Sequence, residues 1–491
     1  MTLRVLCGSN FLAVALATAI MSDLTFLPAV EMAQQVRRRK ISPVELAEFH
    51  LAKIDRLNPK LNAFVQLDAE RVRREARAAE QSVFKGEQLG PLHGVPISIK
   101  SSIEVAGYRC EVGTRLREGM VAPNDAPLVS RLRNAGAIVL GVTNTPELLM
   151  AWETGNLMDG RTNSPWDVDR TPGGSSGGEA AAIASGMSAG GVGSDGGGSI
   201  RVPAHFSGIC GLKPTPGRIP STGHYPPSGG PFALIGVVGP MARTVADLKL
   251  LFEVIQGPDE GDPCSSPVPV RWPAQAEARN LHIGYFEDDG RTPVTPETRA
   301  AVQRAAEALA RRGFQVEPFR PKGLEEAREL WKKFFVKVAG MIIAPMFTGR
   351  ENDASPILRQ FLEWSATEPE LTGQSLLDAW IGRDVTRARF LGQMEKYPIL
   401  LCPAAAIPAF RHGERSWKVD GKTVRYLDAW SYAEWFNLLG NPAAVVPVGQ
   451  SHEGLPIGVQ IVGRPWHEEQ VLMVAAAVER ECQAWRIPPI S

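Results

Sequence analysis

The sequence lacks the features that mark nucleic-acid binders and disulfide-rich secreted proteins. Its 491 residues carry 53 Lys plus Arg and 53 Asp plus Glu, which leaves a formal net charge of zero. A neutral chain has no electrostatic means of holding a nucleic-acid backbone or an anionic membrane, so we expect neither as a partner. The six cysteines lie far apart without a C-x-x-C pair, which favours free thiols in the reducing cytoplasm over disulfides.

Histidine is scarce as well, and its placement argues against a metal centre. The chain has eight histidines, and none belongs to a cluster with metal-ligand spacing. The string His467-Glu468-Glu469 is not the zinc motif H-E-x-x-H, because Val471 stands where the second histidine must be. A chain of this length can bury a core large enough to fold without a metal or a disulfide. We therefore expect no metal.

Residues 1–23 form an N-terminal extension with an apolar run at 11–21, which is too short to span a bilayer as a helix. One positive charge precedes the run, and Ala17-Thr18-Ala19 resembles a cleavage site, so the extension fits a weak signal peptide. The other interpretation is a start site assigned too early, with translation beginning at Met21. The cysteine usage favours this second interpretation and a cytoplasmic protein, with export as the alternative.

From residue 24 onward, helix and strand signals alternate. Residues 42–45 form a capping box with proline at the first helical position, and apolar residues then recur at three- and four-residue spacing. Residues 137–142 are a short apolar run after a helical stretch, as in a buried parallel strand. Strand, helix, glycine cap and strand follow one another again over residues 282–319. This order predicts an α/β layered fold with a largely parallel sheet.

Two stretches interrupt the alternation. Residues 173–217 are rich in Gly and Ser but carry interleaved apolar residues, which predicts packed structure rather than a flexible linker. Residues 325–435 favour helix and hold six of the eleven tryptophans. A buried aromatic core explains these tryptophans, and an aromatic-lined substrate pocket is the alternative.

The glycine-rich stretch matches two common motifs whose contexts argue against them. Residues 191–196 fit G-x-G-x-x-G, but Pro203 would break the helix that a dinucleotide site needs, and residues 215–217 offer no acid. Residues 173–177 fit the G-x-S-x-G elbow of the α/β-hydrolases, with Ser175 as nucleophile. That elbow follows an apolar strand, whereas residues 167–172 are polar. Several downstream histidines keep the elbow open as an alternative.

A third interpretation joins this stretch to a lysine and to a second serine. Lys100 ends the apolar, strand-like run 94–100, and Ser199 follows three glycines whose N–H groups can form an oxyanion-binding nest. With these motifs in order, the spans 91–100, 161–220 and 440–463 resemble the amidase signature family of serine hydrolases. The resemblance implies one domain over residues 24–491, with a large mixed, mostly parallel sheet covered by helices on both faces. It also makes 325–435 a variable, tryptophan-rich pocket region.

The resemblance assigns a Ser–cis-Ser–Lys triad by motif match. Ser199 would be the nucleophile, Ser175 the bridging serine after a cis bond to Gly174, and Lys100 the base. Because lysine is ordinarily protonated at neutral pH, burial must lower the pKa of Lys100 for it to act. Further expected roles are an oxyanion hole from the N–H groups of Gly196, Gly197, Gly198 and Ser199, and support from Ser176, Asp195 and Arg201. Since Gly196 and Gly197 replace a larger residue plus Gly, we expect a more flexible oxyanion turn.

The implied reaction is hydrolysis of amide C–N bonds through an acyl-enzyme on Ser199, with no cofactor. Esters and carbamates are within reach of the same chemistry, and the tryptophans favour an aryl or apolar small-molecule substrate. Three alternatives stay open: the A subunit of a glutamyl-tRNA amidotransferase, a histidine-dependent α/β-hydrolase using Ser175, and an inactive scaffold of the same fold. The chain is expected to be a monomer or a homodimer.

Overall fold

A computed structural model describes residues 24–227, 229–274 and 280–491. The predicted N-terminal extension, and with it the choice between a signal peptide and an early start, lies outside these residues. Within these three ranges, no helix has the length and apolar character needed to cross a membrane.

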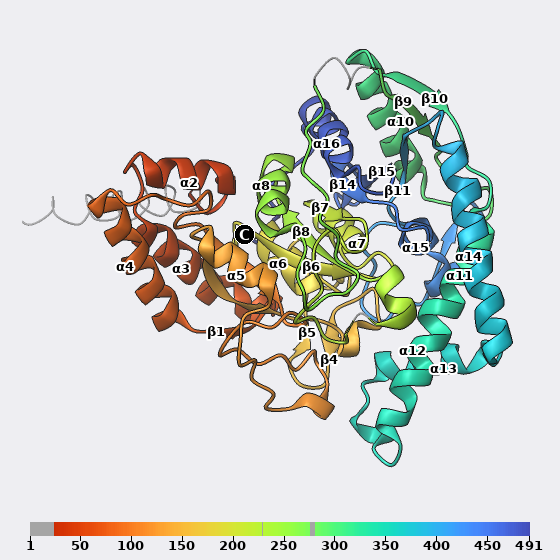
Figure 1. Ribbon diagram of the computed structural model, residues 1–491, viewed down its shortest axis with the longest axis horizontal. Coiled ribbons are helices and arrows are strands. Elements are labelled where there is room, and N and C mark those ends of the chain that lie inside the picture. The colour runs from red at the N-terminus through yellow and green to blue at the C-terminus, as the bar shows by residue number, and fades with distance from the viewer. Residues whose placement is uncertain (1–23, 228, 275–279) are drawn as a thin grey trace, which may run out of the picture.

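A single mixed sheet of eleven strands forms the centre of the fold. It draws its strands from both halves of the chain, so segments far apart in sequence meet within it (Figure 1). In spatial order the strands are β1 (Phe64–Leu67), β3 (Ile138–Thr143), β2 (Pro96–Lys100), β6 (Gly190–Asp195), β8 (Val237–Ala242), β7 (Cys210–Lys213), β14 (Ala443–Gln450), β15 (Pro456–Gly463), β11 (Ile399–Pro403), β9 (His282–Tyr285) and β10 (Gln315–Pro318).

Parallel pairing occurs on the two flanks of this sheet, and the edge strand β1 pairs antiparallel with β3. On one flank β3, β2 and β6 run parallel, and on the other β11, β9 and β10 do so. Between these flanks all pairing is antiparallel, from β6 through β8, β7, β14 and β15 to β11. The α/β class and the large mixed sheet are thus confirmed. The local alternation pointed to the parallel flanks, whereas nothing in it indicated the antiparallel middle.

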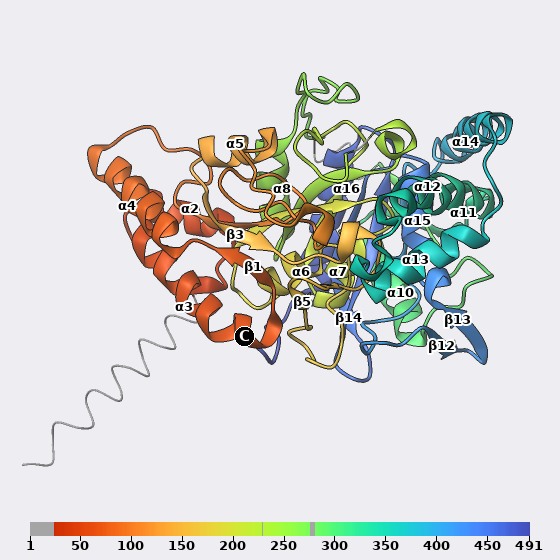
Figure 2. The ribbon, with the colours of Figure 1, turned by 90° about the horizontal axis from the view of Figure 1, so that it is seen from below.

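Helices cover both faces of the sheet, as expected (Figures 1 and 2). Successive residues of β3 point to opposite faces of the sheet, since Ile138 and Leu140 pack in one apolar cluster and Val139 packs in another. This alternation follows from the two-residue period of a strand. The first face carries α3 (Pro43–Leu61), α4 (Ala69–Lys85), α6 (Gly177–Ala184) and α7 (Arg201–Ser207), and the second carries α2 (Ala29–Arg37), α5 (Pro127–Asn134), α8 (Val245–Ile255), α10 (Pro296–Arg311) and α16 (Glu468–Cys482).

Local signals account for several of these elements. The capping box at the start of α3 is present, with the Ser42 side chain accepting from the Val44 N–H and Glu45 accepting from the Ser42 N–H. The predicted strand at 137–142 is β3, and the predicted order over 282–319 appears as β9, α10 and β10. These signals act within one turn or one strand, so the sequence alone reveals them.

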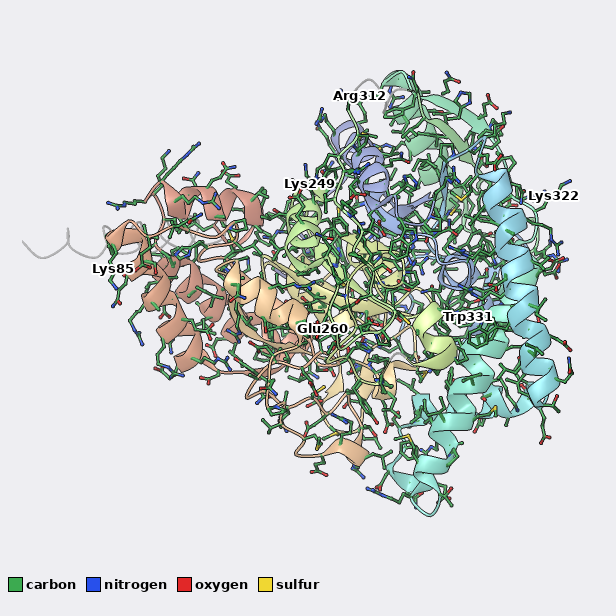
Figure 3. The ribbon with its side chains drawn as sticks, in the orientation of Figure 1. Lys85, Lys249, Glu260, Arg312, Lys322 and Trp331 are labelled. Atoms are coloured by element: carbon green, nitrogen blue, oxygen red, sulfur yellow. The ribbon has the colours of Figure 1, made fainter. Side chains whose placement is uncertain are left out.

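The tryptophan-rich region is mostly helical and lies at the opposite end of the molecule from α3 and α4 (Figures 1 and 2). It also holds β11 and a separate two-stranded sheet of β12 (Ser416–Val419) and β13 (Lys422–Arg425). Trp331, Trp430 and Trp435 are fully buried in its apolar cluster, which supports the aromatic-core interpretation for these three. Trp331 also contacts the backbone that follows β6. In Figure 3 it lies on the inner side of α14 (Gly373–Gln393). The helices of the region are α11 (Leu324–Trp331), a π-helical turn (Lys332–Lys337), α12 (Val338–Ile343), α13 (Pro356–Thr367), α14 (Gly373–Gln393) and α15 (Ser431–Leu438).

Candidate active site

The site forms where two parallel neighbours in the sheet end. Strand β2 ends at Lys100 and β6 ends at Asp195, and Ser98 pairs with Gly191, so the carboxyl ends of both strands meet. Residues 196–199, here called the oxyanion turn, connect β6 to α7. The N-terminus of α6 adds the serine pair 175–176 beside this turn, where the Ser176 N–H donates to the Ser199 carbonyl at 3.2 Å.

Lys100 is fully buried and its amine is surrounded by hydroxyl groups. The Nζ atom lies 2.7 Å from Ser175 Oγ, 2.9 Å from Ser176 Oγ and 3.0 Å from Ser194 Oγ. Burial lowers the pKa of Lys100 to about 7, although the carboxylates of Asp195 and Glu179 act in the opposite direction. A substantial fraction of the amine is therefore neutral at neutral pH, as a base requires.

Ser194 was not anticipated from the sequence. Its hydroxyl accepts from Lys100, and the Ser176 hydroxyl in turn donates to the Ser194 carbonyl at 3.2 Å. The contact depends on the pairing of β2 with β6, which joins residues 94 positions apart. No local pattern carries this pairing, so the sequence held no signal for the residue.

Ser175 follows a cis peptide bond from Gly174, as the resemblance implied. Gly174 is required by close packing, since a Cβ atom there would lie 2.4 Å from the carbonyl oxygen of Glu153. Ser175 and Ser199 both line one cavity, which brings the three candidate triad residues to a single place.

Asp195 and Arg201 brace the oxyanion turn from beneath. Both side chains are fully buried and form an ion pair at 2.9 Å. The carboxylate also accepts the N–H groups of Gly198 at 2.7 Å and Ile200 at 3.0 Å. Burial alone would raise the pKa of Asp195, but the charge and hydrogen bonds of Arg201 outweigh it and hold the pKa well below its usual value. This geometry matches the supporting role expected for both residues.

Gly198 departs from the expectation that four N–H groups face an oxyanion. Its N–H is engaged by Asp195, so it points toward the base of the turn. Gly198 has a φ of +111°, a conformation that residues with a side chain rarely adopt. The turn thus uses Gly198 to reverse the chain, which leaves Gly196, Gly197 and Ser199 as candidate donors.

The outer side of the turn is packed rather than loose. The indole N–H of Trp331 donates to the Gly196 carbonyl at 2.9 Å, and that of Trp152 donates to the Gly197 carbonyl at 2.8 Å. These contacts differ from the flexibility expected of two adjacent glycines. Neither tryptophan was anticipated here, because each lies at least 45 residues from its partner in sequence.

The cavity above these groups has a volume of about 330 Å³ and walls that are mostly apolar. Its size suits a small molecule with one aromatic ring or a short alkyl chain. A larger hollow of about 680 Å³ between α8 and α16 shares no lining residue with it. The side chains that give the catalytic cavity its apolar character are Leu149, Met150, Pro226, Pro227, Phe232, Val237, Phe335, Ala339, Ile342 and Ile343.

Histidine-based activation of Ser175 finds no geometric support. His224 lines the cavity, but its Nδ1 bonds the Pro226 carbonyl at 2.9 Å and its buried Nε2 has no hydrogen-bond partner. Burial and the charge of Lys100 lower the pKa of His224 to about 4. Over the described ranges, no histidine hydrogen-bonds Ser175 or Ser199. In the same part of the chain, no three His, Cys, Asp or Glu side chains are grouped to hold a metal ion.

Comparison with known proteins agrees with this geometry. The family model described as Amidase matches residues 45–472. The chain is 35% identical over 460 residues to the indoleacetamide hydrolase of Bradyrhizobium diazoefficiens, covering 92% of this chain and 86% of that protein. It is 33% identical over 491 residues to the A subunit of the glutamyl-tRNA(Gln) amidotransferase of Moorella thermoacetica, covering 95% of this chain and 99% of that one.

The three-dimensional comparison points the same way. The crystal structure of a bacterial aryl acylamidase of the amidase signature family matches with a TM-score of 0.83 and 27% identity. The match covers 94% of this chain and 98% of that chain. With the triad motifs, the fold and the family match in agreement, the chain belongs to the amidase signature family, whose enzymes hydrolyse amide C–N bonds.

Proposed function

We propose that this amidase hydrolyses small aryl or apolar amides through an acyl-enzyme on Ser199. The observation that carries the proposal is the 2.7 Å contact between Lys100 Nζ and Ser175 Oγ in the wall of the apolar cavity that Ser199 also lines. A buried neutral lysine supplies the base, and a serine beside it can pass on the proton.

The first half of the reaction transfers the acyl group to the enzyme. Ser199 Oγ attacks the amide carbonyl while its proton passes to Ser175 Oγ, whose own proton passes to Lys100 Nζ. The N–H groups of Gly196, Gly197 and Ser199 would hold the negative oxygen of the tetrahedral intermediate. As the C–N bond breaks, the proton returns from Lys100 through Ser175 to the leaving amine. Water then repeats the sequence at the acyl-enzyme and releases the carboxylic acid.

The walls of the cavity support the proposed substrate class. Asp195 is the one charged residue among its described lining residues, and its oxygens are already held by Arg201 and by the turn. A charged substrate would therefore lose its hydration without finding a partner. Similarity to an indoleacetamide hydrolase and to an aryl acylamidase also supports an aromatic substrate. Esters and carbamates present a similar carbonyl group, so we include them among the proposed substrates, after the amides.

A second candidate function is that of an amidotransferase A subunit, which the similarity to the Moorella thermoacetica protein favours. A protein that takes ammonia from glutamine must bind a zwitterionic amino acid beside its nucleophile. Among the described residues, the cavity offers no free cationic side chain for the α-carboxylate. For this reason we favour hydrolysis of apolar amides over the amidotransferase role.

The remaining parts of the proposal concern the setting of the enzyme. We propose one domain over residues 24–491, present as a monomer or homodimer in the cytoplasm. Free thiols at all five described cysteines support a reducing compartment. Export through residues 1–23 is the alternative.

Labelling with a fluorophosphonate followed by peptide mass spectrometry tests the nucleophile and the base together. Wild type should carry one adduct on Ser199, and Lys100→Ala should label at least 100-fold more slowly. An adduct on Ser175, or labelling indifferent to Lys100, would overturn the proposed triad. Turnover of 4-nitroacetanilide by the purified chain alone, compared with glutamine, separates the amidase from the amidotransferase role.

A further inference from the structure

We infer that Trp152 and Trp331 are positioning residues that orient the peptide groups of the oxyanion turn, and that Gly196 and Gly197 are glycines because the stacked rings of Trp331 and Phe335 leave no room for a Cβ atom. The inference rests on the proposed function, because the turn needs oriented N–H groups only if Ser199 is the nucleophile. It names two residues outside the signature motifs that catalysis would require.

Two consecutive carbonyl groups of the turn each accept one indole N–H. Trp331 Nε1 lies 2.9 Å from the Gly196 oxygen, and Trp152 Nε1 lies 2.8 Å from the Gly197 oxygen. Both tryptophans are buried, with 1% and 4% of their surfaces exposed, so water does not compete for these bonds. A hydrogen bond shielded in this way holds its partner more firmly than one at the surface.

The planarity of the peptide bond converts each carbonyl contact into control of an N–H group. In a trans peptide the C=O of one residue and the N–H of the next point in opposite directions. Trp331 therefore fixes the peptide between Gly196 and Gly197 so that the Gly197 N–H points away from the indole. That N–H is one of the proposed oxyanion donors, so its aim depends directly on Trp331.

Trp152 acts on the following peptide, which is held at both ends. Its indole holds the Gly197 carbonyl, while the Asp195 carboxylate accepts the Gly198 N–H from the opposite side at 2.7 Å. This peptide is therefore fixed twice, and it sets the position from which the Ser199 N–H projects. Loss of Trp152 should accordingly be less damaging than loss of Trp331.

Steric fit explains the two glycines. A Cβ atom at Gly196 would lie 2.7 Å from Phe335 Cε2, and one at Gly197 would lie 2.5 Å from Trp331 Cζ2. The rings cannot withdraw easily, because Trp331 stacks on Phe335 with centroids 4.8 Å apart and Trp152 stacks on Trp430 at 5.9 Å. The two glycines thus fit the stacked rings of Trp331 and Phe335.

The decisive experiment removes the indole N–H and retains an aromatic ring. In Trp331→Phe we expect kcat for 4-nitroacetanilide to fall about tenfold with KM changed less than twofold, since a misaimed donor stabilises only the transition state. The affinity for phenylboronic acid, whose tetrahedral adduct on Ser199 occupies the oxyanion hole, should fall by a similar factor. Trp152→Phe should lower kcat about threefold, because Asp195 still holds the same peptide.

Trp435→Phe is the matched control, because Trp435 is equally buried in the same cluster, its Nε1 has no hydrogen-bond partner and its ring packs against Phe286, Tyr432 and Phe436 instead of Trp152. We expect it to leave kcat within twofold while costing similar stability in urea unfolding. Equal losses of kcat in Trp331→Phe and Trp435→Phe, or a rise in KM without a fall in kcat, would refute the inference.

A second substitution covers the case in which the phenylalanine variant does not fold. Replacement of Trp331 by 3-benzothienylalanine preserves the shape of the indole and exchanges the N–H for sulfur, so the same tenfold loss is expected. Retention of full kcat in that variant counts against the inference. Failure of the proposed function is recognised separately, since wild type would then show neither a Ser199 adduct nor turnover.

Discussion

The amine of Lys100 and the hydroxyl of Ser175 lie 2.7 Å apart, although 75 residues separate them in the chain. Neither atom is exposed to bulk solvent to any extent that would stabilise a charge, since Lys100 is 0% and Ser175 1% exposed. We therefore expect this pair to determine how the rate depends on pH.

The rate should rise with pH through neutrality and then level off. Burial lowers the pKa of Lys100 to about 7, and the neutral amine is the form that can accept a proton. Below this pKa the protonated form dominates, so kcat/KM should fall about tenfold per pH unit. A pH profile from 3 to 9 measures this limb. A limb near 4 would instead implicate His224, whose pKa burial lowers to about 4.

Glu179 should influence that limb without touching the substrate. Its fully buried carboxyl group accepts hydrogen bonds from Ser98 and from Thr143 Oγ1 at 2.7 Å. Burial raises the pKa of Glu179 to about 7, so its charge forms over the same pH range in which Lys100 loses its own, and this charge raises the pKa of Lys100. In Glu179→Gln the charge is lost, so the pKa of Lys100 should fall further and the limb should move to lower pH. A limb that stays in place or moves to higher pH would show that Glu179 does not act on Lys100 electrostatically.

Removal of Arg201 should cost far more stability than removal of a surface partner. Arg201 and Asp195 form a fully buried pair, so Arg201→Met leaves a buried carboxylate without its counter-charge. Such a change typically costs about 3–5 kcal/mol. The control is Glu307→Gln, whose exposed partner Arg311 lies 3.9 Å away and contributes less than about 0.5 kcal/mol. Urea unfolding curves compare the two, and similar midpoints would contradict the bracing role.

A methyl group on the oxyanion turn should abolish most of the activity. Gly197→Ala places a Cβ atom 2.5 Å from the Trp331 ring, so either the turn or the ring must move. We expect kcat to fall by about 100-fold, the loss typical of one oxyanion donor. The matched control is Gly392→Ala in α14, where no atom lies within 4 Å and alanine should stabilise the helix by about 1 kcal/mol. Turnover of 4-nitroacetanilide by Gly197→Ala at the wild-type rate would contradict the packing described here.

The cavity wall should set the upper limit of substrate size. Ala339 on α12 lines the cavity, and a phenylalanine at this position would occupy part of its volume of about 330 Å³. In Ala339→Phe we expect kcat/KM to fall at least tenfold for an anilide and less than threefold for a small amide such as propionamide. Equal losses for both substrates would indicate a disturbed fold instead of a smaller pocket. Kinetics on this substrate pair provide the measurement.

Much of the fold was accessible from local sequence signals. The capping box of α3 and the strand–helix–strand order of 282–319 involve neighbouring residues, whose preferences act within a few positions. The antiparallel centre of the sheet was not accessible, because pairing between β7 and β14 joins segments more than 200 residues apart. Periodicity identifies a strand, and it is silent on which neighbour the strand chooses.

The candidate site divides in the same way. Lys100, Ser175 and Ser199 lie in motifs, and the structure places Lys100 against Ser175 with Ser199 in the same cavity. Trp152 and Trp331 lie outside those motifs, and Ser194 lies within the span 161–220 without an expected role, so only tertiary packing reveals their contacts. Gly198 shows the limit most clearly, since its place among three glycines gave no indication that its N–H binds Asp195.

The π-helical turn Lys332–Lys337 separates two tasks along one continuous helical segment. Trp331, just before it, holds the oxyanion turn, whereas Ala339, Ile342 and Ile343, just after it, line the cavity. The number of residues in this turn therefore determines, relative to α11, which side of α12 faces the cavity. Deletion of one residue would rotate α12 by about 100° against the cavity and leave Trp331 in place. A change in the length of this segment would thus alter the substrate range and leave the proposed catalytic residues in place.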